Sequence, residues 1–218
     1  MKDGFKYQPP DTGLAVIHVD DDILVVNKPA GLLSVPGRDP AHRDCLESRV
    51  RQRYRQALLV HRLDMDTSGV MVFAMHALAQ RHLGLQFERR QVLKEYEAVV
   101  EGMPVENSGL IDLPLIVDWP NRPLQKVCFE TGRPAQTAWR VILRHQTSTR
   151  MLLAPTTGRS HQLRVHMKAI GHVILGDRFY AEGTALAAAP RLMLHAKNIS
   201  LAHPNGGEGV TCSAACPF

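Results

Sequence analysis

Short runs of β-branched and aliphatic residues follow one another along this chain with few helices between them, and this order limits the folds open to it. Leu14 to Val19 and Ile23 to Asn27 are separated only by three aspartates, which predicts a hairpin. Further strands are expected at residues 69–74, 95–100, 137–143, 151–153 and near 191–201. Parallel strands need long crossover connections, usually helical. The pattern therefore predicts an α+β fold with a mixed or antiparallel sheet and argues against a doubly wound one.

Three segments have the apolar spacing of an amphipathic helix. They span residues 42–57, with Leu46, Val50 and Tyr54 on one stripe; 77–90, through Leu78, Leu83 and Phe87; and 160–170, with Leu163, Met167 and Ile170 on one face. In the first helix the arginines fall largely off the stripe, which predicts a basic outer face. Residues 1–13 are expected to form a loose arm, 109–134 short strands at best, and the Gly-rich tail no regular structure.

The composition narrows the class of partner and the compartment. Lys and Arg number 26 against 21 Asp and Glu, and the net charge of +5 suits a polyanionic partner such as nucleic acid, although many proteins without one are similar. The 4 cysteines form no CxxC pair, which indicates free thiols in a reducing compartment. Residues 1–10 have no apolar signal core, and no apolar run is long enough to cross a bilayer. A cytoplasmic protein is therefore expected.

Residues 61–69, with the sequence HRLDMDTSG, place two carboxylates, an arginine, a histidine and two hydroxyls in one turn before an apolar strand. Catalytic groups concentrate on loops that rigid strands hold. The alternative is that Asp64 and Thr67 satisfy backbone donors in an Asx-type turn. From the residues alone, the two interpretations carry equal weight.

HRLDMDTSG resembles the HRLDxxTSG signature of the RluA-type family of pseudouridine synthases, and further elements support the resemblance. In chain order these are VNKPAG at 26–31, KEYEA at 94–98, GRSHQLRVH at 158–166, and closing elements at 171–177 and 194–196. The resemblance covers roughly residues 14–204. It implies the pseudouridine synthase fold: a mixed, largely antiparallel sheet with flanking helices and a central RNA-binding cleft, in a single catalytic domain over residues 1–218. Too few residues precede the catalytic motif for the S4-type RNA-binding domain that some relatives carry.

The resemblance implies an isomerase that converts uridine to pseudouridine in stem-loop RNA. Segments 118–123 and 125–127 resemble the subgroup that modifies uridine 32 in tRNA anticodon stem-loops and uridine 746 in 23S rRNA. Because the reaction involves no net redox change and no hydrolysis, no cofactor and no metal are expected. His161 and His166 are poorly spaced for a metal site on one helix face. A monomer is expected. The alternatives are the same chemistry at a single other tRNA or rRNA site, and a non-catalytic RNA-binding module.

The resemblance also assigns catalytic roles. Asp64 is expected to be the essential carboxylate, Tyr96 to stack on the target uracil, and Arg164 to pair with the aspartate and keep it ionised. Attack on C6, attack on C1′ and removal of the C2′ proton all stay open as the aspartate's role. The plainer alternatives are a half-buried core position for Tyr96 and an ordinary surface position for Arg164.

Four more residues are expected to bind substrate. Arg62 would fill the space that a flipped uridine leaves, and His61 would assist it or simply pack in the turn. Arg159 lies beside Ser160 at a helix start, where free backbone donors favour phosphate, although Ser160 also fits a plain N-cap. Leu163, on the following helix, completes the substrate-binding set.

Overall fold

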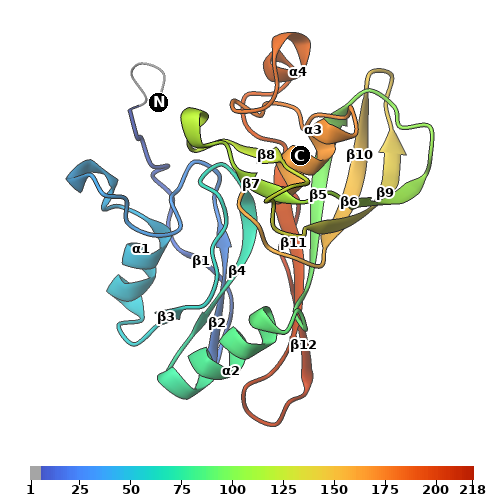
Figure 1. Cartoon of the computed structure of the whole chain (residues 1–218). Helices are drawn as coiled ribbons and strands as arrows, with labels where there is room; N and C mark the ends of the chain where they lie inside the picture. The colour runs from blue at the N-terminus through green and yellow to red at the C-terminus, as the bar shows by residue number, and fades with distance from the viewer. Residues whose placement is uncertain (1–5) are drawn as a thin grey trace. The chain divides into compact units, whose positions relative to one another are not determined.

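The computed structural model describes residues 6–218 and divides them into two compact units (Figure 1). We call residues 6–94 and 196–217 the Asp64 unit, and residues 95–195 with Phe218 the Arg164 unit. Strands β5 (Leu93–Glu101) and β11 (Leu194–Ala202) each have residues in both units. Among the described residues, no helix combines the length and the apolar character that a membrane span requires. That the chain is a single catalytic domain stays a prediction.

The Asp64 unit is a sheet with two helices. Its elements are β1 (Ala15–Val19), β2 (Ile23–Lys28), a 3-10 turn (Pro40–His42), α1 (Leu46–Arg53), β3 (Leu58–Leu59), β4 (Ser68–Ala74), α2 (Ala77–Glu88), most of β11, and β12 (Gly209–Ser213). The strand order is β1-β2-β4-β11-β12, and β3 also pairs with β4. All 7 residues of β4 are buried. The predicted hairpin and the predicted buried strand are therefore confirmed.

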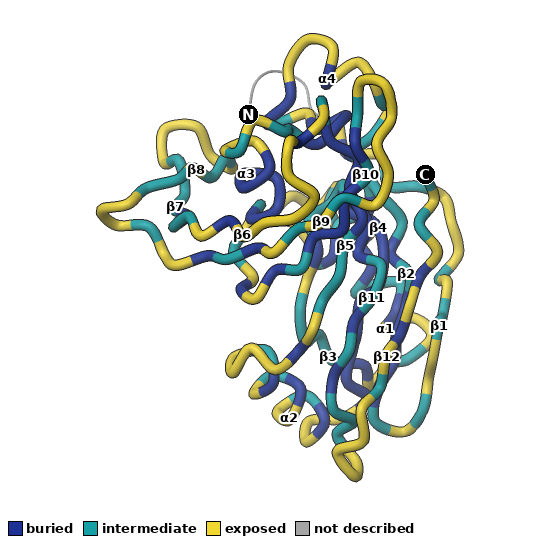
Figure 2. Tube along the Cα trace, turned by 90° about the vertical axis from the view of Figure 1, so that its right-hand side faces the viewer, coloured by how far each residue is buried: buried dark blue, intermediate teal, exposed yellow. Residues whose placement is uncertain are grey.

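Helix α2 packs on β4 because its small and apolar residues recur on one face. Ala79 and Leu83 join Val70 and Val72 of the strand in one buried cluster. Full burial of a Val or Leu side chain contributes about 1.5–3 kcal/mol. Figure 2 shows the alternation of buried and exposed residues along the helix. The prediction that Leu78 shares the apolar stripe is wrong: its side chain is 76% exposed, since it lies one residue off the Ala79–Leu83 line.

The Arg164 unit is built on long antiparallel strands. Its elements are most of β5, then β6 (Ser108–Asp112), β7 (Leu115–Val117), a 3-10 turn (Trp119–Asn121), β8 (Gln125–Val127), β9 (Gln136–Arg144), β10 (Ser148–Pro155), α3 (Gln162–Ala169) and α4 (Gly183–Ala187). The order is β5-β10-β9-β6, all antiparallel, and β7 and β8 form a separate hairpin. Leu163 and Met167 of α3 pack in the same core as Met151 and Leu153 of β10. The predicted fold class is confirmed.

Two predicted helix starts are corrected by capping geometry. Helix α1 spans 46–53 rather than 42–57, because Cys45 and Ser48 form a reciprocal capping box and Tyr54 leaves the helical region at φ −125°. Helix α3 begins at Gln162, and its N-cap is His161 in the left-handed region, at φ 53°. Ser160 is therefore not the N-cap. The helix α4 was not predicted.

Two segments predicted to be irregular or loose are fixed by contacts with other segments. In the arm, Tyr7 is buried, its hydroxyl donates to the Asp44 carbonyl (2.8 Å) and it accepts the Leu33 N–H (3.0 Å). In the tail, β12 pairs antiparallel with β11. The Tyr7 contacts join residues far apart in sequence, whereas β12 pairs with the strand directly before it. The local composition of the arm and of the tail indicated neither contact. The part of the predicted arm before residue 6 lies outside the described residues.

Candidate active site

The predicted site residues belong to both units. His61, Arg62 and Asp64 lie in the Asp64 unit, in the turn before β4; Tyr96 (on β5), Arg159, Leu163 and Arg164 (the last two on α3) lie in the Arg164 unit. In the Asp64 unit these residues precede the buried strand β4, and in the Arg164 unit they lie on or next to β5 and α3. Catalytic residues are commonly held by such rigid elements.

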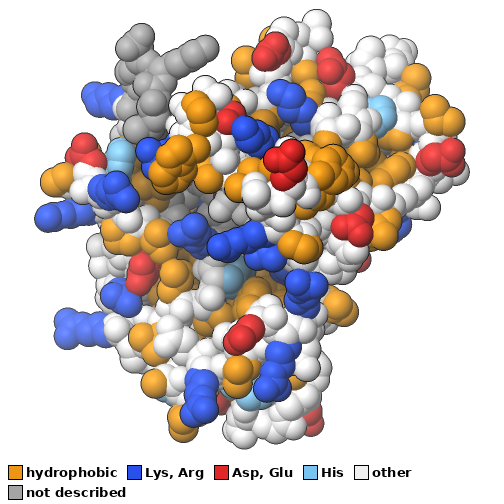
Figure 3. All heavy atoms as spheres, in the orientation of Figure 1, with side chains coloured by type: hydrophobic (Ala, Val, Ile, Leu, Met, Phe, Trp, Pro, Cys, Tyr) orange, Lys and Arg blue, Asp and Glu red, His pale blue; other side chains and the backbone are white. Residues whose placement is uncertain are grey.

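Lys and Arg side chains are spread over the face drawn in Figure 3, consistent with the net charge of +5. One arginine of the predicted basic helix has a structural task instead. Arg49 forms an ion pair with Asp44 (2.7 Å) and donates to the backbone carbonyls of Pro10 and Thr12, both at 2.9 Å. The hydrogen bonds from Arg49 lower the pKa of Asp44, and the same contact raises the pKa of Arg49. Arg49 therefore anchors the segment that precedes β1.

The turn that carries Asp64 is closed by its backbone. The Thr67 N–H donates to the Asp64 carbonyl oxygen at 3.2 Å, so the main chain of the aspartate closes the turn. Thr67 and Ser68 are buried, Asp64 is half-buried, and Arg62 is exposed. The turn thus carries an exposed arginine two residues before a half-buried aspartate.

Both neighbours of Asp64 are held by the last residue of β2 and by the loop that follows it. Lys28 has no exposed surface, and its Nζ donates to the carbonyls of Pro29 (2.9 Å), Leu32 (2.7 Å) and Met65 (2.9 Å). Burying an ammonium is costly unless it is hydrogen-bonded, and these three carbonyls supply that compensation. The sequence motif VNKPAG contained this lysine, but no role was predicted for it.

Ser34 fixes the residue on the other side of the aspartate. Its hydroxyl donates to the Leu63 carbonyl at 2.6 Å and accepts the Leu63 N–H at 3.2 Å. Together with the Met65 contacts, these bonds fix the main chain immediately before and after Asp64. Holding both flanks limits the directions that the carboxylate can take, which is what a positioned nucleophile or base requires.

His61 is a packed residue of the turn. Its Nε2 accepts the N–H of Val72 in β4 at 3.0 Å, and its ring stacks on Phe87 of α2 with 4.8 Å between centroids. Burial, with a smaller effect from the Lys94 charge, lowers the pKa of His61 to about 3. The imidazole is therefore neutral, with its proton on Nδ1. The packing alternative is what the structure describes, and assistance to Arg62 stays a prediction.

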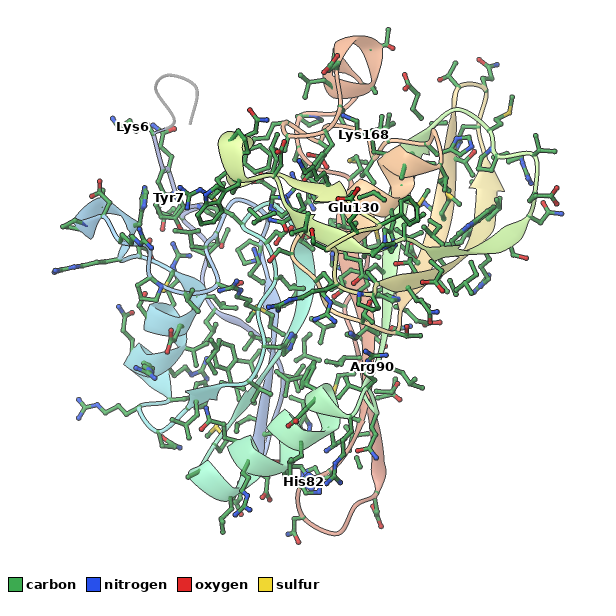
Figure 4. The ribbon with its side chains drawn as sticks, viewed as in Figure 1. Lys6, Tyr7, His82, Arg90, Glu130 and Lys168 are labelled. Carbon is green, nitrogen blue, oxygen red and sulfur yellow. The ribbon has the colours of Figure 1, made fainter. Side chains whose placement is uncertain are left out.

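Arg164 is buried, so the alternative of an ordinary surface arginine is wrong. Only 2% of its surface is exposed, and it binds Asp177 in a bidentate manner: Nε to Oδ2 at 2.8 Å and Nη2 to Oδ1 at 2.6 Å. Its guanidinium carbon also lies 5.1 Å and 5.2 Å from the ring centroids of Phe179 and Tyr180. Figure 4 shows α3 among its side chains, with Lys168 labelled near its end. Asp177 was not predicted as a site residue, although it is the last residue of the closing element at 171–177.

A polar network fixes α3 on the strands beneath it. The Gln162 amide donates to the Gln136 carbonyl (2.9 Å) and the Thr137 hydroxyl (3.1 Å). His166 contacts the same hydroxyl through Nδ1 (2.9 Å) and the Leu113 carbonyl through Nε2 (3.0 Å). A carbonyl can only accept, so Nε2 carries the proton, and burial lowers the pKa of His166. This imidazole is thus committed to structure rather than to a metal.

The remaining predicted residues have core or rim positions. Tyr96 is half-buried on β5 and packs against the core that contains Leu163, which is 6% exposed. Arg159 is half-exposed, and its Nε donates to the Pro134 carbonyl at 3.2 Å. Its N–H donates to the side chain of Gln162 at 3.0 Å. These contacts leave the roles in stacking and phosphate binding as predictions.

Comparison with known proteins gives one family and several near relatives. The family model described as RNA pseudouridylate synthase matches residues 22–169. Dual-specificity RNA pseudouridine synthase RluA of Escherichia coli O6:H1 is 55% identical over 214 residues, which cover 97% of this chain and 98% of that protein. The protein of the same name from Pasteurella multocida is 50% identical with the same coverage. Among solved structures, Human RNA Pseudouridylate Synthase Domain Containing 1 aligns with a TM-score of 0.81 and 28% identity, over 97% of this chain and 87% of that one.

Proposed function

The chain belongs to the RNA pseudouridylate synthase family, and we propose that it modifies uridine 32 of tRNA anticodon stem-loops and uridine 746 of 23S rRNA. It is an isomerase that converts uridine to pseudouridine in RNA. The observation that carries the proposal is the 55% identity to a dual-specificity synthase over 97% of this chain and 98% of that protein. Residues 118–127 support the same subgroup through their resemblance to it.

Isomerisation of uridine to pseudouridine requires a positioned carboxylate and no redox partner. The bond between C1′ of ribose and N1 of uracil breaks, the base turns, and C1′ is joined to C5, whose hydrogen is released. We assign the carboxylate to Asp64, and the fixed main chain at Leu63 and Met65 supports this assignment. The oxygen attacks C6 or C1′, or removes the C2′ proton; these three routes stay open. The reaction proceeds without metal or cofactor.

The other catalytic assignments are Tyr96, which stacks on the uracil, and Arg164, which keeps the carboxylate ionised. Burial of the Arg164 guanidinium and its two bonds to Asp177 support a fixed, directed cation. A uridine within structured RNA must leave its stack, at a cost of roughly a few kcal/mol, and Arg62 fills the space it vacates. His61, Leu163 and Arg159 complete the substrate-binding set. The protein is a cytoplasmic monomer in this proposal.

Tritium release from RNA labelled at uridine C5 tests the catalytic assignment. In an anticodon stem-loop we expect release by the purified protein in the presence of EDTA. The Asp64→Asn variant should lose activity by about a thousandfold or more, as enzymes do on loss of their nucleophile, while RNA binding persists. Asp66→Asn is the matched control, because the same turn carries it, and it should keep most activity. Full activity in Asp64→Asn would refute the assignment, and loss of release in EDTA would favour a metal-dependent enzyme.

The substrate proposal needs a separate assay. Two short stem-loops, one with the tRNA position and one with the 23S rRNA position, should both release tritium. Release from only one would indicate a single-site synthase. Release from neither, with activity on other RNA, would remove the substrate proposal and leave the family's chemistry intact. Binding of both without release from any RNA would favour the non-catalytic RNA-binding alternative.

A further inference from the structure

A cluster of histidines and aspartates lies at one end of the Asp64 unit, in the turn between β1 and β2 and the connection between β11 and β12. Among residues 6–218, Asp20, Asp22 and His203 form the group whose ligand atoms all lie within 4.8 Å of one another. All three residues are half-buried. The predicted catalytic turn does not include them, and the isomerisation gives them no role.

Asp20 presents one carboxylate oxygen in a fixed direction. Its Oδ1 accepts the backbone N–H groups of Asp22 and Ile23, both at 2.8 Å. Its Oδ2 then faces two imidazole nitrogens, Nε2 of His18 at 2.6 Å and Nε2 of His203 at 3.2 Å. The carboxylate is therefore held in one direction and faces both imidazoles.

His203 has the second contact that a metal-binding imidazole needs. Its Nδ1 accepts the backbone N–H of Asn205 at 3.1 Å and lies 2.9 Å from the carbonyl oxygen of the same residue. Without a metal, Nε2 therefore carries the proton and faces Oδ2 of Asp20 at 3.2 Å. When a metal replaces that proton, Nδ1 takes up the proton and donates to the Asn205 carbonyl. Metal-bound histidines usually donate their other N–H to a carbonyl or carboxylate in this manner.

Asp22 is supported from outside the cluster. Its Oδ1 lies 3.0 Å from Nε2 of His76, whose Nδ1 accepts the Ala79 N–H at the start of α2. Because Nδ1 is an acceptor there, Nε2 of His76 carries a proton and donates to Asp22. His76 thus orients the carboxylate and does not itself supply a ligand atom.

We propose that Asp20, Asp22 and His203 bind a divalent transition-metal ion, with Zn²⁺ as the ion that the donors fit best. Imidazole nitrogen favours Zn²⁺ over the hard cations Mg²⁺ and Ca²⁺, which prefer all-oxygen sites. Two carboxylates balance the charge of the ion. The bound metal links the β1–β2 turn to the β11–β12 connection, which lies at the lower end of Figure 1. Its effect is on the stability of this unit and not on the isomerisation.

Calorimetric titration of the full chain with Zn²⁺ tests the site. We expect one strong site per chain, a rise in the melting temperature on saturation, and, with Co²⁺ as a probe, d–d absorption without sulfur-to-metal charge transfer. Asp20→Asn should lose the binding although it keeps the Oδ1 acceptor that forms the turn. His203→Gln should lose it independently, since this residue comes from the other segment. Both variants should keep tritium-release activity, so this outcome does not depend on the proposed function.

His145→Gln is the control, because this histidine is exposed on the turn between β9 and β10 and lies outside the cluster. Its Zn²⁺ affinity should equal that of the unchanged protein. The proposal is overturned by any of three results: no strong site in the unchanged protein, equal binding in Asp20→Asn and His203→Gln, or sulfur-to-cobalt charge transfer, which would place the metal on cysteine.

Discussion

Lys28, the last residue of β2, holds the turn that carries Asp64. Its ammonium lies in the interior and donates to three carbonyls, one of them at Met65 beside the aspartate. Hydrogen bonds from a charged donor are worth more than neutral ones, and each buried acceptor that loses its donor adds a desolvation cost. One side chain therefore contributes both to the stability of the unit and to the direction of the proposed catalytic group.

Replacing Lys28 by Met keeps a similar volume and removes the donors. We expect a loss of about 3 kcal/mol or more in the free energy of unfolding, because three carbonyls lose a charged partner together. Urea denaturation measures it, and kcat should fall more than RNA affinity. Lys126→Met is the control: Lys126 is exposed and lies 3.4 Å from Asp118, and an exposed pair contributes about 1 kcal/mol at most. Equal stability losses in the two variants would contradict the role of Lys28.

The buried ring of His61 predicts how the stability of the protein depends on pH. Its pKa falls from 6.5 to about 3 in the folded protein, so the unfolded chain binds a proton below pH 6.5 that the folded one does not. Stability contributed by the neutral ring is therefore full above pH 6.5 and declines as the pH falls toward 3. The slope is about 1.4 kcal/mol per pH unit between pH 6 and 4. Unfolding curves of the protein and of His61→Gln should differ by this slope, and parallel pH profiles would contradict the assignment.

At the scale of elements, β4 is the strand on which the Asp64 unit depends. One edge pairs with β2; along the other edge lie Ala196 of β11, the ring of His61, and β3. Gly69 makes the closest approach: it has φ +117°, and a Cβ there would lie 2.1 Å from the Ala196 carbonyl oxygen. Close packing against β11 thus explains, separately from catalysis, why the HRLDMDTSG motif ends in glycine.

Substituting alanine at two glycines should give opposite results. Gly69→Ala should destabilise the protein by about 3 kcal/mol or more, since it combines backbone strain with a clash against main chain. Gly84→Ala, in the interior of α2 with nothing within 4 Å of the new Cβ, should stabilise it by about 0.5–1 kcal/mol. Thermal and urea unfolding measure both. A neutral Gly69→Ala variant would mean that β4 and β11 are not held as closely as described.

For the whole molecule, the positive net charge should appear as salt dependence of RNA binding. Each phosphate contact releases condensed counterions, so the logarithm of the association constant falls linearly with the logarithm of salt concentration. The net charge of +5 is moderate. Because phosphates are common to all RNA, the affinity for RNA of any sequence should decrease with salt concentration in this way. Specificity then comes from the flipped base and the loop, which are not sensitive to salt in the same way.

Arg159→Gln tests the phosphate assignment in these terms. The slope of log K against log[salt] should shrink by roughly 0.7–1, the value of one phosphate contact. Arg81→Gln, an exposed arginine on α2, carries the same charge change and should leave the slope unchanged. Filter binding of a stem-loop RNA at several salt concentrations measures both. Equal slopes for Arg159→Gln and the unchanged protein would contradict the proposed contact between Arg159 and a phosphate.

The sequence by itself determined the fold class, most of the strands, and the family. These rest on local information: the period of apolar residues marks β2, β4, β5, β9 and β10, and contiguous motifs carry the resemblance at 61–69 and 158–166. The helix at 77–90 was predicted for the same reason and is found at 77–88. Local patterns fix an element's type because steric and hydrogen-bonding preferences act between near neighbours.

Only the tertiary structure decided which of the polar residues are interior and what they bind. Arg164 and Lys168 share a helix face in sequence, yet Arg164 is buried on Asp177 while Lys168 is exposed. Asp20 meets His203 across 183 positions of the chain, and Tyr7 meets Asp44 across 37. The reason is physical: the free energy of burying a charged or polar group depends on its partner, and these partners come from distant parts of the chain.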